Sequence, residues 1–505
     1  MISAFSNTWK IPELRDRILF TLAMVVIVRL GVFIPLPGID THIIDLFVEK
    51  LSTADGTESG GAQLGVLMNV FSGGGLTQMG IFALGIMPYI SASIMMQLLT
   101  AVVPKLSKLS KEDGGRQKIN QYTRFVTIAI ALVQGFLLAK SLQSPENLPF
   151  LNGIGEVIRE HGELVPNYGT GFVLMTVLTI VSGTMFLMWI GDQITDRGIG
   201  NGTSLIISVN IISSVPSVMV QAWDTFVVNS DGNPYKVLIL VFLFVFLIFV
   251  IAATISITQA QRRIAVQYAR RVAGRREMSG GTQYLPLKIN YAGVMPIIFA
   301  TAILSLPPTV LGQIFPNASW VITVREILYP DTIWFYLISG TMIFFFSYFW
   351  VATMFNPSEI AENLKKGGGY VPGVRPGKPT SDFLDFTMTR LTFAGSIFLT
   401  LIFMLPFFVA LALGLPPYSL ITSFFGGTSL LILVGVLLDM MRQVETHLLQ
   451  RNYDGFLRKG KIKGRSSRRM QQGAAANHSS NGVIYLWTVL ALVVIIAIVA
   501  FMVKG

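Results

Sequence analysis

Charged residues are scarce in this sequence. Asp, Glu, Lys and Arg make up 13% of the 505 residues, whereas ordinary globular proteins contain about 25%. A water-soluble surface needs more charge than this, so a soluble protein of several domains is excluded. Long apolar runs alternate with short charged or Gly- and Pro-rich stretches, a pattern typical of a protein that crosses a membrane many times.

Cysteine is absent and histidine is rare. Without Cys the chain has no disulfide, no thiolate nucleophile and no Cys-ligated zinc or iron–sulfur centre. The four His are far apart in the sequence and form no H-E-x-x-H motif; they are His42, His161, His447 and His478. These counts argue against a metal enzyme, and the sequence predicts no catalytic residue, cofactor or metal.

An energy-transducing site is also lacking. The nearest lookalike of a phosphate-binding loop, residues 373–379, has the wrong Gly spacing and has Pro where Ser or Thr should hold Mg²⁺. Any work done through this protein must therefore be driven by a partner.

About eleven apolar runs are long enough to cross roughly 30 Å of hydrocarbon as helices. They lie near 18–38, 76–100, 122–142, 171–190, 203–222, 236–257, 291–312, 333–355, 390–412, 427–446 and 483–503. Arg29 lies near the far end of the first run, where it either snorkels to the interface or pairs within the helix bundle.

Positive charge is concentrated in alternate connections. All but seven of the 38 Lys and Arg lie in the N-terminus and in 101–124, 191–202, 258–290, 356–390 and 442–482. By the positive-inside rule these segments are cytoplasmic, and an eleventh crossing places the C-terminus outside. The net charge of +11 therefore mostly reflects sidedness.

Two basic connections have the features of docking surfaces. The connection 258–290 carries Arg262, Arg263, Arg275 and Arg276, which suit RNA phosphate or an acidic protein surface, although the positive-inside rule alone accounts for this charge equally well. The connection 356–390 is rich in Gly and Pro, which predicts a shaped turn that presents Arg375.

Residues 62–76, on the outer side, form a short apolar stretch that ends in three glycines. The stretch is far too short to span the membrane, so it is either a re-entrant element buried in protein or a half-helix on the outer surface. The spans contain almost no charged residues, which disfavours an ion-coupled carrier.

Several motifs resemble the SecY family, the pore subunits of the bacterial Sec protein translocase. They lie at 81–99, 183–202, 285–296, 363–377 and 425–432, and the resemblance covers essentially residues 10–460. It implies an all-α polytopic fold with a ten-helix pore in two pseudo-symmetric halves. The predicted eleventh C-terminal helix is a departure that the resemblance does not explain.

The resemblance divides the chain into parts. It implies an N-terminal half (1–222), a hinge-side connection with the sixth helix (223–257), a basic loop (258–290), the remainder of the C-terminal half (291–446), a basic tail and linker (447–482) and the extra helix (483–505).

The resemblance also implies the function and the site. The protein would pass unfolded preproteins across the bacterial cytoplasmic membrane and release transmembrane segments laterally into lipid, driven by the motor SecA or the ribosome. The small subunits SecE and SecG would be partners, and signal sequences and nascent chains substrates.

The implied site residues fall into four sets. The pore ring comprises Ile86, Ile90, Ile207, Ile298 and Ile432; the plug comprises Leu64, Leu67, Met68, Phe71, Gly73, Gly74 and Gly75; the lateral gate comprises Ser91, Gln97 and Asn290; and the docking residues are Arg262, Arg263, Arg275, Arg276 and Arg375.

Two other functions remain open from the sequence alone. A secondary transporter of small solutes would also be built from inverted repeats, and a membrane-anchored ribosome receptor would use the basic loops alone. The first needs a charge or polar broken helices at the membrane midplane, and the second does not explain the segment 62–75.

Overall fold

The computed structural model places most of the chain in helices. It describes residues 12–53, 72–112, 114–143, 145, 154–228, 234–268, 271–273, 276–278, 281–314, 318–328, 332–413, 421, 424 and 428–458. The eleventh apolar run (483–503) and most of the segment 62–75 therefore lie outside the described residues.

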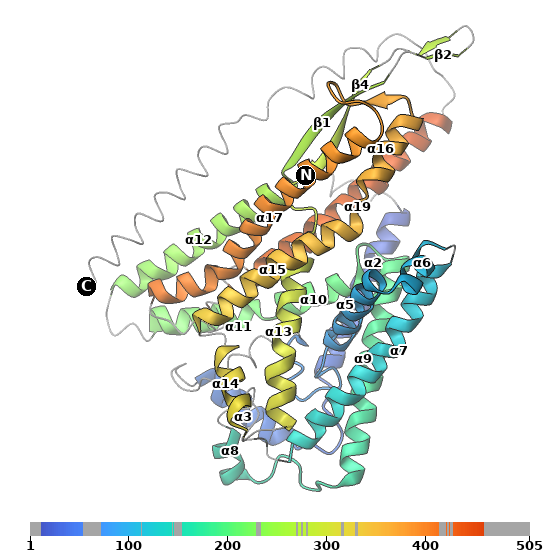
Figure 1. Cartoon of the computed structure of the whole chain (residues 1–505). Coiled ribbons are helices and arrows are strands. Elements are labelled where there is room, and N and C mark those ends of the chain that lie inside the picture. Colours follow the sequence, from blue (N-terminus) through green and yellow to red (C-terminus); the bar gives the residue numbers. More distant parts are fainter. Residues whose placement is uncertain are drawn as a thin grey trace.

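The N-terminal part of the chain forms a first group of helices. In this group α7 packs against α5 and α9, and α9 also contacts α2 and α10. The helices are α2 (Pro12–Val32), α3 (Thr41–Thr53), α5 (Met87–Val102), α6 (Pro104–Lys111), α7 (Gly115–Ser141), α8 (Ile154–His161), α9 (Thr170–Arg197) and α10 (Gly202–Ser213) (Figure 1).

The C-terminal part forms a second group. Here α15 packs against α13 and α17, and α19 contacts α12 and α17. The helices are α11 (Val215–Trp223), the π-helix η2 (Asp224–Val228), α12 (Pro234–Gln259), α13 (Met295–Ile314), α14 (Ser319–Ile327), α15 (Ile333–Met354), α16 (Pro357–Lys366), α17 (Lys378–Leu413) and α19 (Thr428–Arg458). The two groups meet where α10 contacts α19 and where α13 contacts α5 and α7.

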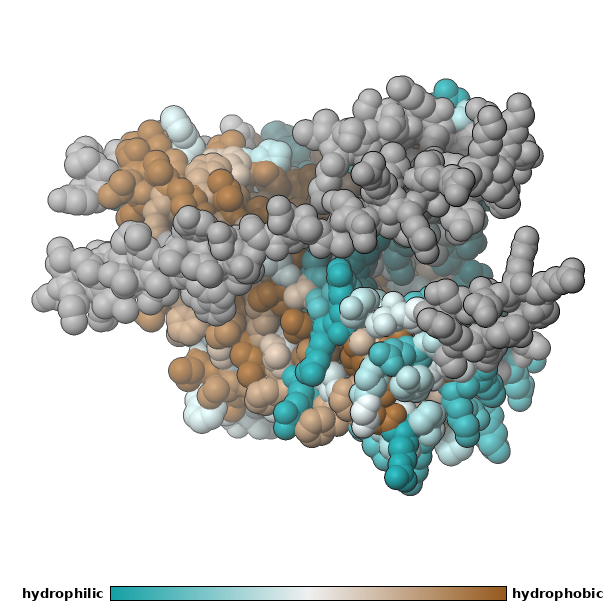
Figure 2. Space-filling view, turned by 90° about the horizontal axis from the view of Figure 1, so that it is seen from above, coloured by the Kyte–Doolittle hydropathy of each residue, from teal (hydrophilic) through white to brown (hydrophobic). Residues whose placement is uncertain are grey.

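Each of the first ten predicted apolar runs contains a described helix. By length and composition, six described helices can cross a membrane, or seven when α5 and the helix after it, bent by 103°, count as one span. Side chains such as Leu238, Val241 and Ile248 on α12 are exposed in the isolated chain, as expected of a helix that faces lipid. Apolar residues gather on one side of the molecule in Figure 2.

The helix boundaries differ from the runs in two ways. Helix α5 begins at Met87 rather than near 76, because residues 73–86 form turns in which Gly73, Gly74 and Gly85 have positive φ. Helices α17 and α19 extend well beyond their apolar runs into the basic connections. An apolar run predicts only the membrane-embedded part of a helix. Residues with high helix propensity, such as Lys, Gln and Leu, extend the helix beyond the membrane into water.

A small sheet adds to the helical fold. Strands β1 (Gln261–Tyr268), β4 (Thr282–Lys288) and β5 (Gly369–Tyr370) form an antiparallel sheet in the order β4-β1-β5, and β2 (Arg271–Ala273) pairs with β3 (Arg276–Met278). The side chains of Ile264 and Val266 alternate with polar residues and are buried against α15 and α17. The all-α prediction therefore holds for the spans, and the connection 258–290 is a β-hairpin.

The connections separate into two ends of the molecule (Figure 1). Helices α3, α8 and α14 lie at one end, and α6, α16 and the sheet lie at the other. The second set belongs to the connections with concentrated positive charge. The alternation of charge along the sequence thus corresponds to two opposite ends in space.

Candidate functional site

The five isoleucines predicted for the pore ring are all buried and belong to one large apolar cluster that extends through both helix groups. Ile86 and Ile90 come from the start of α5, and the others come from α10 (Ile207), α13 (Ile298) and α19 (Ile432). Their side chains are between 1% and 8% exposed. Four helices from both groups therefore contribute to one apolar contact region.

Local sequence fixes where the two helices associated with Ile86, Ile90 and Ile207 begin. Gly85, with φ of 55°, and Pro88 in the first turn of α5 start that helix immediately after Ile86. The N–H of Ile90 then donates to the carbonyl of Ile86 at 3.1 Å, so these two residues are one helical turn apart. Helix α10 is started by Asn201, whose side-chain oxygen accepts from two backbone N–H groups of the first turn.

The three polar residues predicted for the lateral gate lie on elements near the junction of the groups. Ser91 is buried on α5, and the Gln97 Nε2 donates to the Ser93 Oγ at 3.0 Å on the same helix. Asn290, also buried, follows β4 and lies against Gly395 of α17. Helix α13 contacts both α5 and α7, so the helices of the second, third and seventh apolar runs meet here, whereas the resemblance implies a lateral gate in which the second and third spans face the seventh and the eighth.

The three glycines at the end of the predicted plug are described, whereas Leu64, Leu67, Met68 and Phe71 lie outside the described residues. Gly73 and Gly74 have φ of 68° and 92°, a conformation that L side chains rarely adopt. The Arg29 Nη1 donates a hydrogen bond of 2.8 Å to the Gly73 carbonyl. Of the two roles that the sequence left open for Arg29, pairing within the bundle is therefore the observed one.

The two predicted docking connections meet at the sheet, where β5 of one pairs with β1 of the other. Arg262 and Arg263 are exposed on β1, and Arg375 is exposed in the turn between β5 and α17. Strand β5 pairs with β1, and the Tyr370 hydroxyl donates to the Gln267 Oε1 at 2.9 Å. Of the other two arginines, the backbone of Arg276 lies in β3 and Arg275 lies outside the described residues.

Sequence reasoning missed a junction at the basic end of the molecule. The Gly200 N–H donates to the Gln443 Oε1 of α19 at 2.8 Å, and the Ile199 N–H donates to the Thr21 Oγ1 of α2 at 3.1 Å. The turn between α9 and α10 is thus held by helices from both groups. The only sequence signal for it is the density of Gly in residues 198–202.

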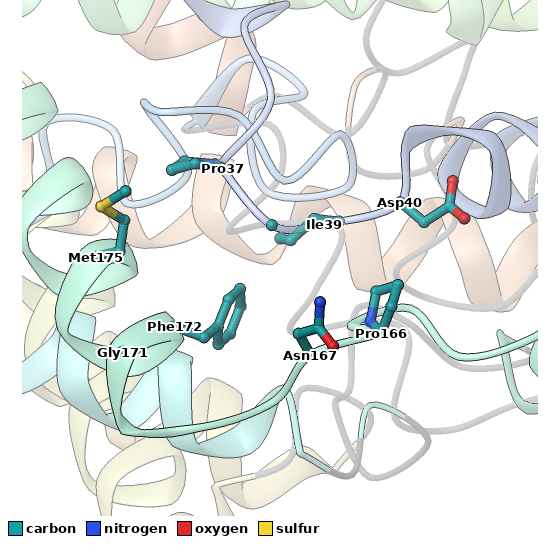
Figure 3. A pocket seen from close by; sticks show the side chains of 9 residues that line it. Pro37, Ile39, Asp40, Pro166, Asn167, Gly171, Phe172 and Met175 are labelled. Carbon is teal, nitrogen blue, oxygen red and sulfur yellow. The ribbon is translucent and has the colours of Figure 1, made fainter.

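A pocket of about 500 Å³ lies away from the isoleucines (Figure 3). It is formed by the connection after α2 and the start of α9, and its lining includes Pro37, Asp40, Asn167, Phe172 and Met175. Phe172 and the neighbouring Ile39 belong to a second apolar cluster, separate from that of the isoleucines. This pocket is not part of the region where the two groups meet.

Metal-binding chemistry finds no support in the part of the chain that the structure describes. That part contains no group of three or more His, Cys, Asp or Glu side chains placed to hold a metal ion. His42 and His161 do approach each other, with ring centroids 6.5 Å apart, but they lie on α3 and α8, at the end of the molecule opposite the sheet (Figure 1). Fold and site together define a multi-pass membrane protein whose helix groups meet around apolar side chains.

Comparison with known proteins identifies the family. The family model for SecY matches residues 80–441. A protein translocase subunit SecY of Chlamydia trachomatis is 40% identical over 471 residues (92% of this chain and 100% of the relative), and that of Aquifex aeolicus is 42% identical over 456 residues (89% and 98%). The chain therefore belongs to the SecY family, and it is a protein-conducting channel subunit of the Sec translocon rather than an enzyme.

Solved structures share the fold at low sequence identity. One is a SecY protein whose plug domain stabilises the closed state of the translocation channel, with 17% identity, a TM-score of 0.54 and coverage of 86% of this chain and 92% of that chain. Another is Sec61 in the canine ribosome–channel complex from the endoplasmic reticulum, with 15% identity, a TM-score of 0.52 and the same coverage.

Proposed function

We propose that the five isoleucines form the constriction through which this channel passes unfolded preproteins. The observation that carries the proposal is that Ile86, Ile90, Ile207, Ile298 and Ile432 reach one buried cluster from four helices of both groups. A channel for arbitrary sequences cannot use a stereospecific polar site, whereas aliphatic side chains seal around any chain and exclude water when no chain is present. The burial of all five corresponds to a closed channel.

The segment 62–75 acts as the plug of the resting channel. The solved SecY protein described above has such a plug domain, and in this chain the positive φ of Gly73 and Gly74 supplies a joint at the end of the segment. The lateral gate is the seam where α13 contacts α5 and α7. Ser91 and Gln97 lie on α5, and Asn290 lies a few residues before the start of α13. Transmembrane segments leave the channel there and enter lipid.

The arginine-bearing sheet docks the driving partner. Arg262 and Arg263 of β1 and Arg375 of the turn after β5 are exposed at the sheet, which suits ribosomal RNA phosphate or acidic side chains of the SecA motor. A Sec61 channel of the same fold is seen in complex with the ribosome. Small membrane subunits of the SecE and SecG type complete the complex.

The protein resides in the bacterial cytoplasmic membrane, with its N-terminus and basic connections in the cytoplasm. Its halves are 1–222 and 223–446, with the basic loop 258–290 projecting from the second and the tail 447–482 leading to the extra helix 483–505. The bacterial relatives and the collection of positive charge at one end of the molecule support this arrangement.

Depletion of the protein in cells tests the function. We expect uncleaved secretory precursors to accumulate promptly, because precursors that use this channel cannot cross the membrane once it is depleted. Accumulation should be reversed by the unaltered chain. Collapse of a solute flux without any accumulation of precursors would instead favour a transporter.

Deletion of residues 470–505 should leave preprotein translocation intact at normal protein levels, and loss of translocation would contradict this expectation.

A further inference from the structure

The turn between α9 and α10 is held by side chains from both helix groups. The Ile199 N–H donates to the Thr21 Oγ1 of α2 at 3.1 Å, and the Gly200 N–H donates to the Gln443 Oε1 of α19 at 2.8 Å. Ile199 and Gly200 are both buried. A buried backbone N–H without a partner is costly, so Thr21 and Gln443 each satisfy a donor of the turn.

Gly200 packs directly against α19 because it has no side chain. Its φ is 90°, and an added Cβ would lie 2.9 Å from the Met440 Cγ. Met440 and Gln443 are three residues apart and therefore share one face of α19. On the other side of the turn, a Cβ added at Gly198 would lie 2.5 Å from the Thr21 Oγ1. The turn thus fits closely between α2 and α19.

The same turn fixes where α10 begins. The Asn201 side-chain oxygen accepts from the N–H groups of Thr203 and Ser204 in the first turn of α10. The Gly202 N–H donates to the Thr195 Oγ1 of α9 at 2.9 Å. The hydrogen bond that Gln443 accepts therefore joins α19 to the defined start of α10.

The two helices joined in this way each carry a residue of the proposed constriction. Ile207 lies about 10 Å along α10 from Gly200, and Ile432 lies about 16 Å along α19 from Gln443. Helices α10 and α19 also contact each other. Apolar contacts are non-directional, so they fix the position of one helix along another only weakly. A hydrogen bond has a defined length and angle, and it therefore sets the register of α10 against α19.

We propose that Gln443 is a positioning residue that holds Ile207 and Ile432 at the level at which the idle channel is sealed. The inference rests on the proposed role of the isoleucines as the constriction. A shift of α10 along α19 moves these two side chains apart, and an apolar seal excludes water only while its members stay together. Gln443 acts through the two helices and not as a member of the apolar cluster.

The test uses the full channel complex in proteoliposomes, with Gln443→Met and Gln443→Glu. Methionine has a similar length but no oxygen to accept from Gly200, whereas glutamate keeps that acceptor. Because Gln443 is exposed, neither substitution leaves a cavity. We expect Gln443→Met to raise the ion leak without precursor about five- to tenfold, since the Gly200 N–H then lacks its partner. Gln443→Glu should be as tight as the unaltered channel.

Thr21→Val is the matched control. Thr21 accepts from the neighbouring N–H of the same turn, but it lies on α2, in the same helix group as α10. Valine has a similar volume and no acceptor for this bond. We expect this variant to lower thermal stability without a change in leak. Equal leak from Thr21→Val and Gln443→Met would overturn the proposal, because the effect would then come from general loosening of the turn.

A distance measurement reports the register directly. The chain contains no Cys, so Ile212→Cys on α10 and Leu437→Cys on α19, each 46% exposed in the unaltered chain, supply two sites for spin labels. We expect the distribution of distances between the labels to widen at least twofold in Gln443→Met and to stay unchanged in Gln443→Glu and Thr21→Val. An unchanged distribution in Gln443→Met would overturn the proposal, and Gln443→Ala provides the same comparison if that variant does not assemble.

The two readouts together separate the inference from the proposed function. If Gln443→Met widens the distance distribution but leaves the leak unchanged, Gln443 sets the register and the role of the isoleucines as the seal is refuted. If the leak rises while the distribution stays unchanged, the positioning role of Gln443 is refuted.

Discussion

Replacement of Ile207 by Asn tests whether the isoleucine cluster seals the channel. Ile207 is 3% exposed and lies on α10, which contacts α19 of the opposite group. Truncation of a buried Ile typically costs about 2–5 kcal/mol, and a buried amide without a partner costs about 1–3 kcal/mol more. Opening of the constriction hydrates the amide and relieves the second cost and part of the first. We therefore expect a shift of about 3 kcal/mol towards the open state, or about a hundredfold in its population.

The assay measures the ion leak of reconstituted channels in the absence of precursor, together with transport of a precursor that has an inactive signal sequence. Both should rise markedly in Ile207→Asn. Ile180→Asn is the control, because Ile180 is completely buried on α9 in the second apolar cluster and should lower thermal stability without leak. The reasoning is refuted if Ile207→Asn assembles normally and stays as tight as the unaltered channel, or if Ile180→Asn leaks as much.

Three further predictions concern the basic end of the molecule. Gly200→Ala should lower thermal stability by about 1–2 kcal/mol in unfolding scans, since φ is 90° and the added Cβ would lie 2.9 Å from a methionine side chain of α19; unchanged stability would contradict this. Burial, and then the charge of Arg442, lower the pKa of Lys288, while Asp439 opposes the shift. The unfolded chain thus binds more protons between the lowered pKa and the ordinary 10.5, so stability should rise with pH across that window, and Lys288→Met should abolish the rise in pH-dependent melting curves. Arg375→Ala should weaken ribosome binding several-fold in low-salt sedimentation and have little effect at high salt, because screening removes exposed charge contacts; an equal effect at both salt concentrations would point to a structural role.

Much of the fold could be predicted because a membrane-spanning helix is recognised from the amino-acid composition of a short stretch of sequence. Ten of the helices follow from apolar runs, and the two ends of the molecule follow from alternating charge. The sheet had a local signal too, since Ile264 and Val266 alternate with polar residues. That two-residue period is short and lies in a strongly charged connection, so it is a weak signal. The pairing of β1 with residues 369–370 is not a local property and cannot be predicted from the connection itself.

The site could be predicted only through the family resemblance. An isoleucine in a span is ordinarily a packing or lipid-facing residue, and nothing in composition separates Ile207 from its neighbour Ile206, which is equally buried. Polar contacts between residues far apart in the sequence also could not be predicted from composition. The bond of Arg29 to Gly73 joins residues 44 positions apart, and that of Gly200 to Gln443 spans 243 positions, so only the folded chain reveals them.

Helix α19 connects the docking end of the molecule with the isoleucine cluster. It carries Ile432 in the cluster and, about 16 Å further along the helix axis, Gln443, which accepts the hydrogen bond from Gly200. Its Asp439 and Arg442 act electrostatically on Lys288 at the end of β4. Helix α19 is thus linked to the sheet through charge, to the turn at Gly200 through a hydrogen bond, and to the isoleucine cluster through Ile432. Substitutions in the cluster should therefore change the leak of the idle channel, whereas substitutions on the sheet should change partner affinity and leave the idle channel closed.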